Sequence, residues 1–146
     1  MQTPRNLPPK NPGGINGKMN IGHVGLRVPD YAAAIGWYTQ KLGFRVLKEW
    51  TVGELQLAFL APANDDTVWL EVLSDGTLSG APTAPPLVLG YHHICLEVEN
   101  VDQTLADLRE RGVATIREPF DVPAIGKRCG FVADLNGNVL EFSANC

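Results

Sequence analysis

The chain contains one sequence pattern twice. The separation between His23 and Glu71 along the chain is the same as that between His93 and Glu141, so a single offset aligns both pairs. The residues around the histidines agree as well, because His23-Val-Gly-Leu-Arg-Val aligns with His93-Ile-Cys-Leu-Glu-Val. A repeat of this length predicts two copies of one structural unit, and it restricts the possible folds more than composition does.

The four repeated residues lie in short segments in which apolar residues alternate with other residues. In the first of them Val24, Leu26 and Val28 share one face of a strand, so His23 and Arg27 lie on the opposite face. The second histidine segment and both glutamate segments alternate in the same way. We therefore expect four strands that each cover an apolar face and present a histidine or a glutamate on the other.

Each repeat is predicted to fold as a strand, a helix and three further strands. The first helix has an N-terminal signal in Pro29-Asp30 and ends at Gly43. Asn136-Gly137, between two apolar runs, predicts a hairpin turn. In the first repeat we expect a strand at 20–28, a helix at 30–42 and strands at 44–52, 54–61 and 67–74. In the second we expect a strand at 91–99, a helix at 101–111 and strands at 113–118, 127–133 and 138–144.

These elements indicate an α+β protein of two tandem βαβββ modules. We expect residues 1–18, rich in proline, glycine and asparagine, to form a flexible tail. Residues 19–145 then form one domain. Module one spans 19–75, a proline-rich linker spans 76–89, and module two spans 90–145.

Composition excludes several classes of function. The net charge of −4 comes without a basic patch, which argues against a nucleic-acid partner. No apolar run approaches the length of a membrane span, and the N-terminus lacks an apolar signal segment. The three cysteines form an odd set without framework spacing, as expected for reduced thiols. We therefore predict a cytoplasmic protein without a membrane partner.

The repeated residues have the chemistry of metal ligands. A single histidine or glutamate on a strand is more often a solvent-facing residue, but four at one offset favour a shared site. Two imidazoles and two carboxylates leave two open positions on a six-coordinate Ni, Co, Mn, Fe or Zn ion, and the set does not choose among these metals. His92 takes the register of Gly22, so we expect it to be a structural residue.

Several motifs resemble those of the vicinal oxygen chelate superfamily, which includes glyoxalase I, methylmalonyl-CoA epimerase, extradiol dioxygenases and bleomycin resistance proteins. The motifs are the two histidine segments, Ile35-Gly-Trp-Tyr, Lys41-Leu-Gly-Phe and Asp134-Leu-Asn-Gly-Asn-Val-Leu-Glu-Phe. The resemblance implies that the sheets of two modules enclose a cleft with one divalent metal ion per site. Its ligands by position are His23, Glu71, His93 and Glu141.

The resemblance is strongest to glyoxalase I-like lyases of the lactoylglutathione lyase type. It implies an enzyme that moves a proton next to a carbonyl, converting a hemithioacetal to a thioester through an enediolate stabilised by the metal. By position Glu141 is the catalytic base, and Glu71 is the opposite acid or base. Family members commonly form homodimers, in some cases completing the cleft from two chains, so we expect a homodimer here.

The substrate-binding residues are predicted by position. Arg27 matches an arginine that binds glutathione in glyoxalase I, whereas Asp75 stands where those enzymes have asparagine and would repel an anionic ligand. Lys127 and Arg128 begin a strand and are candidates for the cleft mouth. Trp69, Tyr91 and Phe131 are candidate aromatic residues of the cleft. The expected ligand is a small molecule, either a 2-oxoaldehyde–thiol adduct or an acyl-CoA.

Three alternatives stay open within the superfamily. A methylmalonyl-CoA epimerase-like enzyme is supported by Gly90-Tyr-His-His, although that enzyme usually has glutamine at the position of Glu71. An extradiol dioxygenase uses two histidines and one carboxylate, so a fourth ligand crowds the site for oxygen. Resistance or binding proteins typically lose the ligands, and here all four are present.

Overall fold

A computed structural model describes residues 8–11, 22–77, 91 and 93–146 of the chain. Most of the predicted tail at 1–18, most of the predicted linker at 76–89, and His92 lie outside these ranges. The predictions for these segments therefore stay predictions.

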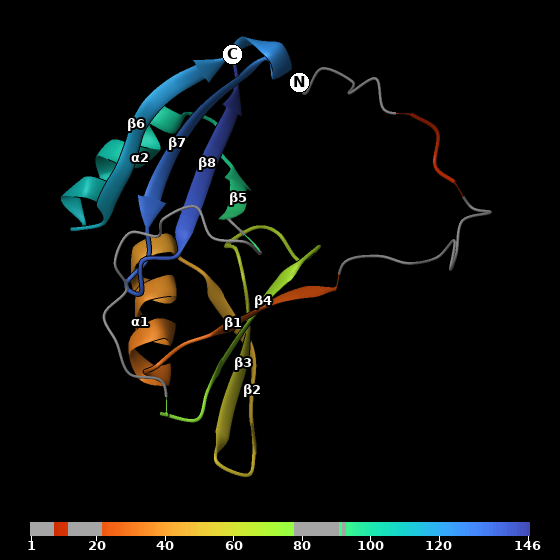
Figure 1. Cartoon of the computed structure of the whole chain (residues 1–146), viewed down its shortest axis with the longest axis vertical. Helices are drawn as coiled ribbons and strands as arrows, with labels where there is room; N and C mark the ends of the chain where they lie inside the picture. The colour runs from red at the N-terminus through yellow and green to blue at the C-terminus, as the bar shows by residue number, and fades with distance from the viewer. Residues whose placement is uncertain (1–7, 12–21, 78–90, 92) are drawn as a thin grey trace.

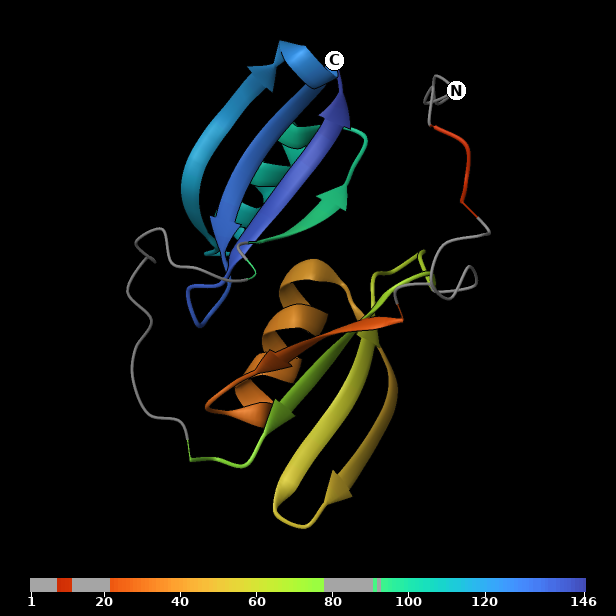
Figure 2. The same ribbon diagram turned by 45° about the vertical axis from the view of Figure 1, so that its right-hand side comes forward.

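Each module folds as a strand, a helix and three strands, and the two modules lie one above the other along the long axis of the molecule (Figures 1 and 2). The sheet orders are β1-β4-β3-β2 and β5-β8-β7-β6. The predicted α+β architecture of two βαβββ modules is thereby confirmed. Module one contains β1 (His23–Arg27), α1 (Tyr31–Leu42), β2 (Arg45–Val52), β3 (Leu55–Ala61) and β4 (Trp69–Ser74). Module two contains β5 (His93–Glu97), α2 (Val101–Glu110), β6 (Ala114–Val122), a short 3-10 helix η1 (Pro123–Ile125), β7 (Lys127–Ala133) and β8 (Val139–Asn145).

Equivalent signals fix the two helices. The Asp30 carboxylate accepts a hydrogen bond from the Ala33 backbone N–H at 2.9 Å, and the Asn100 side chain accepts one from Gln103 N–H at 2.9 Å. Both bonds satisfy amides that the first helical turn leaves unpaired. Gly43 ends α1 with a φ of 69°, a left-handed conformation in which glycine has no steric cost. The predicted start and end of α1 are confirmed.

The strand predicted at 113–118 is wrong at its end, because β6 runs on to Val122 and passes through Pro119. Proline lacks the N–H that a central strand needs. However, β6 is the edge of its sheet, and its register with β7 shifts between Arg117 and Phe120. An edge strand with a bulge accommodates a proline.

The sheet pairing places each histidine strand beside its glutamate strand. β1 runs parallel to β4 with Gly25 opposite Glu71, and β5 runs parallel to β8 with Cys95 opposite Glu141. The alternate residues of these strands point to the other face, where the helices cover them. That face contributes most of one apolar core, which includes the buried residues Tyr38, Leu60, Val72, Leu105, Leu140 and Phe142.

Equivalent residues of the two modules meet at the ends of the helices. Lys41 and Arg111 occupy the same position of the repeat. The Lys41 ammonium donates to the Arg111 carbonyl at 2.6 Å, and the Arg111 guanidinium donates to the Lys41 carbonyl at 3.2 Å. A reciprocal contact between equivalent positions indicates an approximate two-fold axis between the modules. A second link joins the Tyr38 hydroxyl to the Asp134 carboxylate at 2.8 Å, and both side chains are buried.

Within the part of the chain that the structure describes, neither helix has the length and apolar content needed to cross a lipid bilayer.

Candidate functional site

The structure brings the four predicted ligands together as two pairs. The Nε2 atom of His23 lies 3.5 Å from a carboxylate oxygen of Glu71, and the Nε2 atom of His93 lies 2.8 Å from a carboxylate oxygen of Glu141. The glutamate side chains are mostly covered, at 19% and 16% exposed, and the histidines are more open at 45% and 34%. We call these pairs the first and second half-sites.

The distances within each half-site fit a shared metal ion. Nitrogen and oxygen ligands bind divalent metals at about 2.1 Å, so two ligands at right angles lie about 3 Å apart. The 2.8 Å and 3.5 Å separations are close to that spacing. Among the described residues, however, no three His, Cys, Asp or Glu side chains form a group that could hold an ion. Each half-site by itself is therefore an incomplete set of ligands.

An aromatic wall stands beside the first half-site. The Phe59 ring lies 5.3 Å from the His23 ring, and the rings of Trp50 and Trp69 lie 4.7 Å and 5.1 Å from Phe59. Phe59 occupies this place because β3 pairs it directly with Glu71. Trp69 was predicted for the cleft, whereas Phe59 and Trp50 were not.

The second half-site has an equivalent wall. The Phe131 ring lies 5.7 Å from the His93 ring, Phe120 stacks on Phe131 at 5.9 Å, and the Arg117 guanidinium lies 3.5 Å above Phe120. Phe131 pairs directly with Glu141. Phe131 was predicted for the cleft, and Phe120 and Arg117 were missed. Tyr91, the third predicted aromatic residue, is fully exposed.

The residues that the sequence analysis missed occupy equivalent positions in the two sheets. Lys48 is opposite Phe59 on the neighbouring strand, and Arg117 is opposite Phe131. Each half-site thus has a row of glutamate, phenylalanine and a basic residue across its sheet. The repeat offset does not align these residues. The separation between Phe59 and Phe131 is slightly larger than the offset, and the separation between Lys48 and Arg117 is slightly smaller than the offset. The loop between β3 and β4 (62–68) is longer than the loop between β7 and β8 (134–138), which changes the spacing of the phenylalanines. The connection between β6 and β7 and the register shift between Arg117 and Phe120 displace Arg117.

The two glutamates have different neighbours. Gly25 stands beside Glu71, and a Cβ atom there would lie 3.8 Å from the Glu71 carboxylate. Cys95 holds the equivalent place beside Glu141. Burial, together with hydrogen bonding to Glu141, raises the pKa of Cys129 to about 11, and burial raises the pKa of Cys95 as well. Both thiols therefore stay protonated at neutral pH, as weak donors near Glu141.

Arg27 does not face the first half-site as an unpaired cation. Its guanidinium lies 2.6 Å from the Asp75 carboxylate. The backbone N–H and the hydroxyl of Thr77 donate to the same carboxylate, at 3.0 Å and 2.6 Å. The bonds from Thr77, followed by that from Arg27, hold the pKa of Asp75 well below its usual range. The ion pair leaves this end of the half-site electrically neutral.

The other predicted basic residues are paired as well. The Lys127 ammonium lies 3.3 Å from the Glu97 carboxylate, on the face that carries the second half-site. Arg128 points to the opposite face, where its guanidinium donates to Asp102 at 2.7 Å and to Asp121 at 2.8 Å. The structure therefore brings Lys127, but not Arg128, to the side of the predicted metal ligands.

Comparisons with known proteins agree with this geometry. The sequence matches the Glyoxalase/Bleomycin resistance protein/Dioxygenase superfamily over residues 20–142. It is 27% identical to human mitochondrial methylmalonyl-CoA epimerase over 83% of this chain and 71% of that protein. It is also 27% identical to a probable lactoylglutathione lyase of Synechocystis over 84% of this chain and 93% of that protein.

Solved structures show the same fold. A glyoxalase family protein from Enterococcus faecalis superposes with a TM-score of 0.71 and 28% identity over 86% of this chain and 97% of that one. The trypanothione-dependent glyoxalase I of Leishmania major superposes with a TM-score of 0.65 and 30% identity over 85% of each chain. The protein therefore belongs to the glyoxalase/bleomycin resistance protein/dioxygenase superfamily.

Proposed function

We propose that this protein is a divalent-metal-dependent enzyme of the glyoxalase I type, which converts the hemithioacetal of a 2-oxoaldehyde and a thiol into a thioester. The observation that carries the proposal is the duplicated His–Glu pair. Each copy has the ligand spacing of a metal site and lies on an aromatic-lined sheet face. Relatives named lactoylglutathione lyase support the same reaction type.

The complete site is proposed to form between two copies of the chain. Among the described residues of one copy the two half-sites do not join into a larger ligand group, so a metal ion with four protein ligands needs a half-site from each of two chains. A symmetric homodimer joins the first half-site of one chain to the second half-site of its partner, twice. The dimer thus has two equivalent sites, and each takes one ion.

Four residues would hold the ion: His23 and Glu71 from one chain, and His93 and Glu141 from the other. This nitrogen and oxygen donor set accepts Ni, Co, Mn, Fe or Zn. When bound, a divalent ion supplies Lewis-acid stabilisation of the negative charge that develops on a substrate oxygen.

The glutamates perform the proton transfer. A carboxylate oxygen of Glu141 removes the proton from the carbon that bears the sulfur and the hydroxyl group, and the C–H electron pair moves toward the neighbouring carbonyl. Glu141 then returns the proton to that neighbouring carbon. Glu71, on the opposite side, takes the proton from the hydroxyl group and gives it to the oxygen of the former carbonyl. The product is an isomer of the substrate, so the step needs neither oxidant nor reductant.

The aromatic walls and the basic residue on each wall position the substrate. Phe59 and Phe131 shield the reacting carbons from water, which strengthens the electrostatic interactions at the glutamates. Arg117 lies above Phe120 at the outer strand and is our candidate for binding an anionic group of the thiol.

A second candidate is the epimerisation of an acyl-CoA. One observation favours it, because the Arg27–Asp75 ion pair neutralises the end of the half-site where a thiol with two carboxylates would need a cation. The same pair of glutamates would remove a proton from one face of the carbon next to the carbonyl and return it to the other. Human methylmalonyl-CoA epimerase is among the relatives.

The deciding experiment follows thioester formation from methylglyoxal and glutathione by ultraviolet absorbance. The purified full-length protein is loaded in turn with Ni, Co, Mn and Zn. We expect metal-dependent turnover that Glu141→Gln abolishes and that Glu118→Gln, at an exposed glutamate paired with Arg109, leaves unchanged. Absence of turnover by the metallated protein would contradict the lyase assignment.

The same preparation tests the second candidate through exchange of the substrate α-proton in methylmalonyl-CoA. The variant Glu71→Gln separates the two activities. A glyoxalase site needs the carboxylate, whereas an epimerase site accepts glutamine at this position.

A further inference from the structure

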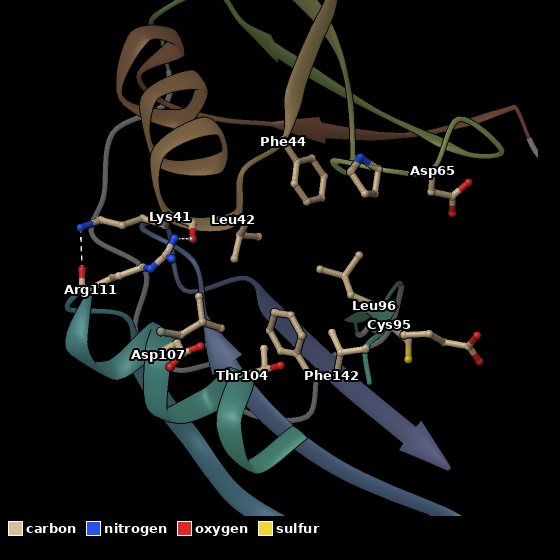
Figure 3. A pocket seen from close by; sticks show the side chains of 14 residues that line it. Lys41, Leu42, Phe44, Asp65, Cys95, Leu96, Thr104, Asp107, Arg111 and Phe142 are labelled. Atoms are coloured by element: carbon tan, nitrogen blue, oxygen red, sulfur yellow. Dashed lines mark hydrogen bonds between the residues drawn. The ribbon is translucent and has the colours of Figure 1, made fainter. Parts of the chain in front are cut away.

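A cavity of about 460 Å³ lies between the two modules, on the helix side of their sheets (Figure 3). Neither half-site lines it. Its walls come from the end of α1 and the start of β2 in module one, and from β5, β8 and α2 in module two. A second hollow of about 240 Å³ continues from it along Val24, Ile94 and Leu140. The volume is within the range of sites that bind small organic ligands.

From this cavity we infer a second binding site, which takes a small amphipathic carboxylate with an apolar body and one anionic end. The middle of the cavity is apolar. Leu42 and Phe44 from module one face Leu96 and Phe142 from module two, as Figure 3 shows. Such side chains bind an apolar chain or ring by removing it from water.

Two basic residues determine where the anionic end of the ligand binds. Lys41 and Arg111 stand together at one end of the cavity (Figure 3). Their side chains donate hydrogen bonds to each other's backbone carbonyl groups, and these bonds do not neutralise either positive charge. An ammonium has three N–H donors and a guanidinium five, so both retain donors for a ligand. Asp107 of α2 also lines the cavity near Arg111 and accepts a hydrogen bond from the Gln103 amide at 2.7 Å. Its single negative charge leaves this end positive, because Lys41 and Arg111 carry two positive charges.

The opposite end of the cavity does not bind the ligand's carboxylate. Asp65 accepts hydrogen bonds from the backbone N–H and the hydroxyl of Thr67, at 2.8 Å and 2.5 Å. Glu97 is paired with Lys127. Both acids at this end are therefore satisfied by the protein, and they repel an anionic group. A ligand with a single carboxylate consequently binds with that group at Lys41 and Arg111.

The repeat shows why the cavity lies beside α2. At the equivalent positions α1 has Trp37-Tyr38 and α2 has Asp107-Leu108. Tyr38 is only 1% exposed, fills the space beside its own helix and donates to Asp134. Leu108 is smaller, and Asp107 is polar, so the equivalent space beside α2 stays open. The two helices thus differ at the positions that decide whether the cavity exists.

Decanoate is a suitable probe, with 1-decanol as its uncharged partner. Decanoate is titrated into the full-length protein by calorimetry, and displacement of the fluorescent sulfonate 1-anilinonaphthalene-8-sulfonate gives a second readout. We expect saturable binding of one decanoate per chain. The double variant Lys41→Gln/Arg111→Gln should weaken decanoate binding at least tenfold and leave 1-decanol binding unchanged, because glutamine keeps a donor but removes the charge.

Arg109→Gln is the matched control, since Arg109 lies on the same helix and is paired with Glu118 outside the cavity. It should leave the decanoate affinity unchanged. Leu108→Tyr places the α1 residue at the α2 position and should fill the cavity, lowering decanoate affinity at least tenfold. Thermal unfolding checks that this variant is folded, and the charge variants decide the result if it is not.

Two results would overturn the inference: no saturable decanoate binding by the wild-type protein, or binding that Lys41→Gln/Arg111→Gln leaves unchanged. The variant His93→Ala/Glu141→Gln should retain full decanoate binding. The carboxylate site is therefore tested separately from the proposed lyase activity, and either can fail without the other.

Discussion

The two modules share one topology but differ in what surrounds equivalent positions. Each holds a His–Glu pair with a phenylalanine beside it on the same sheet face. On the helix side they diverge, because α1 has the buried Tyr38 where α2 has the smaller Leu108, and Leu108 lines the cavity between the modules. The comparison indicates that the two repeats share the geometry of the half-site, whereas the packing on the helix side of the sheets differs between them.

The largest expected effect is on activity, in two double variants that each lack a different half-site. A chain with His23→Ala and Glu71→Gln should be inactive, and so should a chain with His93→Ala and Glu141→Gln. When the two are refolded together, half of the dimers are mixed, and each mixed dimer has one intact site. Activity should therefore return to about a quarter of the wild-type value.

Mixing that restores nothing, while size-exclusion chromatography shows mixed dimers, would place the complete site within one chain. Metal content measured on the same samples gives an independent readout, since only the intact sites should retain one ion each. Two wild-type chains carried through the same refolding serve as the control for recovery.

The next effect concerns the buried link between the modules. Tyr38→Phe removes the hydrogen bond to Asp134 and leaves that buried carboxylate without one of its donors. We expect the free energy of unfolding to fall by about 2–3 kcal/mol, as for hydrogen bonds to buried charged groups. Tyr31→Phe, which removes a 3.3 Å bond to the Leu57 carbonyl, is the control and should cost less. Urea unfolding of the three proteins measures the difference.

The same tyrosine should make stability depend on alkaline pH. Burial, followed by the charge of Asp134, raises the pKa of Tyr38 above its ordinary value near 10. The unfolded chain then loses the proton first, so the contribution of Tyr38 is complete below pH 10 and declines as the pH rises. The stability difference between wild type and Tyr38→Phe should shrink by about 1.4 kcal/mol per pH unit above pH 10. A constant difference up to pH 11 would contradict this account.

A smaller effect is expected where α2 packs against its sheet. A Cβ atom on Gly130 would lie 2.7 Å from Leu105, so Gly130→Ala forces the side chains of α2 to move. We expect a loss of about 1–2 kcal/mol, because the contacting atom is the end of a flexible side chain. In module one Ala58 holds the equivalent register position, opposite Val72 as Gly130 is opposite Phe142. Leu105→Ala removes the side chain that a Cβ atom on Gly130 would contact, so it should restore part of the stability lost in Gly130→Ala. Calorimetric melting temperatures of the single and double variants measure this coupling.

The smallest effect is expected at the ion pair near the first half-site. Asp75→Asn removes the carboxylate that compensates Arg27. The freed guanidinium should lower the KM for a glutathione-derived substrate a few-fold and leave kcat unchanged. The substrate made with 2-mercaptoethanol has no carboxylate, and its KM should not change. Equal shifts for both substrates would show that Arg27 does not contact the anionic part.

Much of the fold could be predicted from local signals. Alternation of apolar residues predicted the strands, and the start and end signals of α1 were correct because its Asp30 cap and its left-handed Gly43 depend on neighbouring residues alone. β6 was predicted too short because Pro119 is tolerated only at a sheet edge, and strand order is not a local property.

The candidate site was predictable only in part. Trp69 and Phe131 were expected near the candidate ligands, but Phe59 and Arg117 were missed, because loops of unequal length between the strands and a register shift in β6 move them away from the repeat offset. Arg27 and Asp75 were predicted as separate substrate contacts, and the structure joins them in an ion pair. Pairings between strands and between charges follow from three-dimensional register, which spacing along the chain does not contain.

The sequence by itself determined the duplication, the module topology and the spacing of His23, Glu71, His93 and Glu141, since these depend on periodicity and on short-range conformational preference. Only the tertiary structure decided that these four residues form two separate pairs among the described residues, that Tyr38 bridges the modules and that a cavity lies beside α2. The physical reason is that module packing depends on side-chain volume and hydrogen-bond geometry across distant segments. These quantities exist only once the sheets have formed.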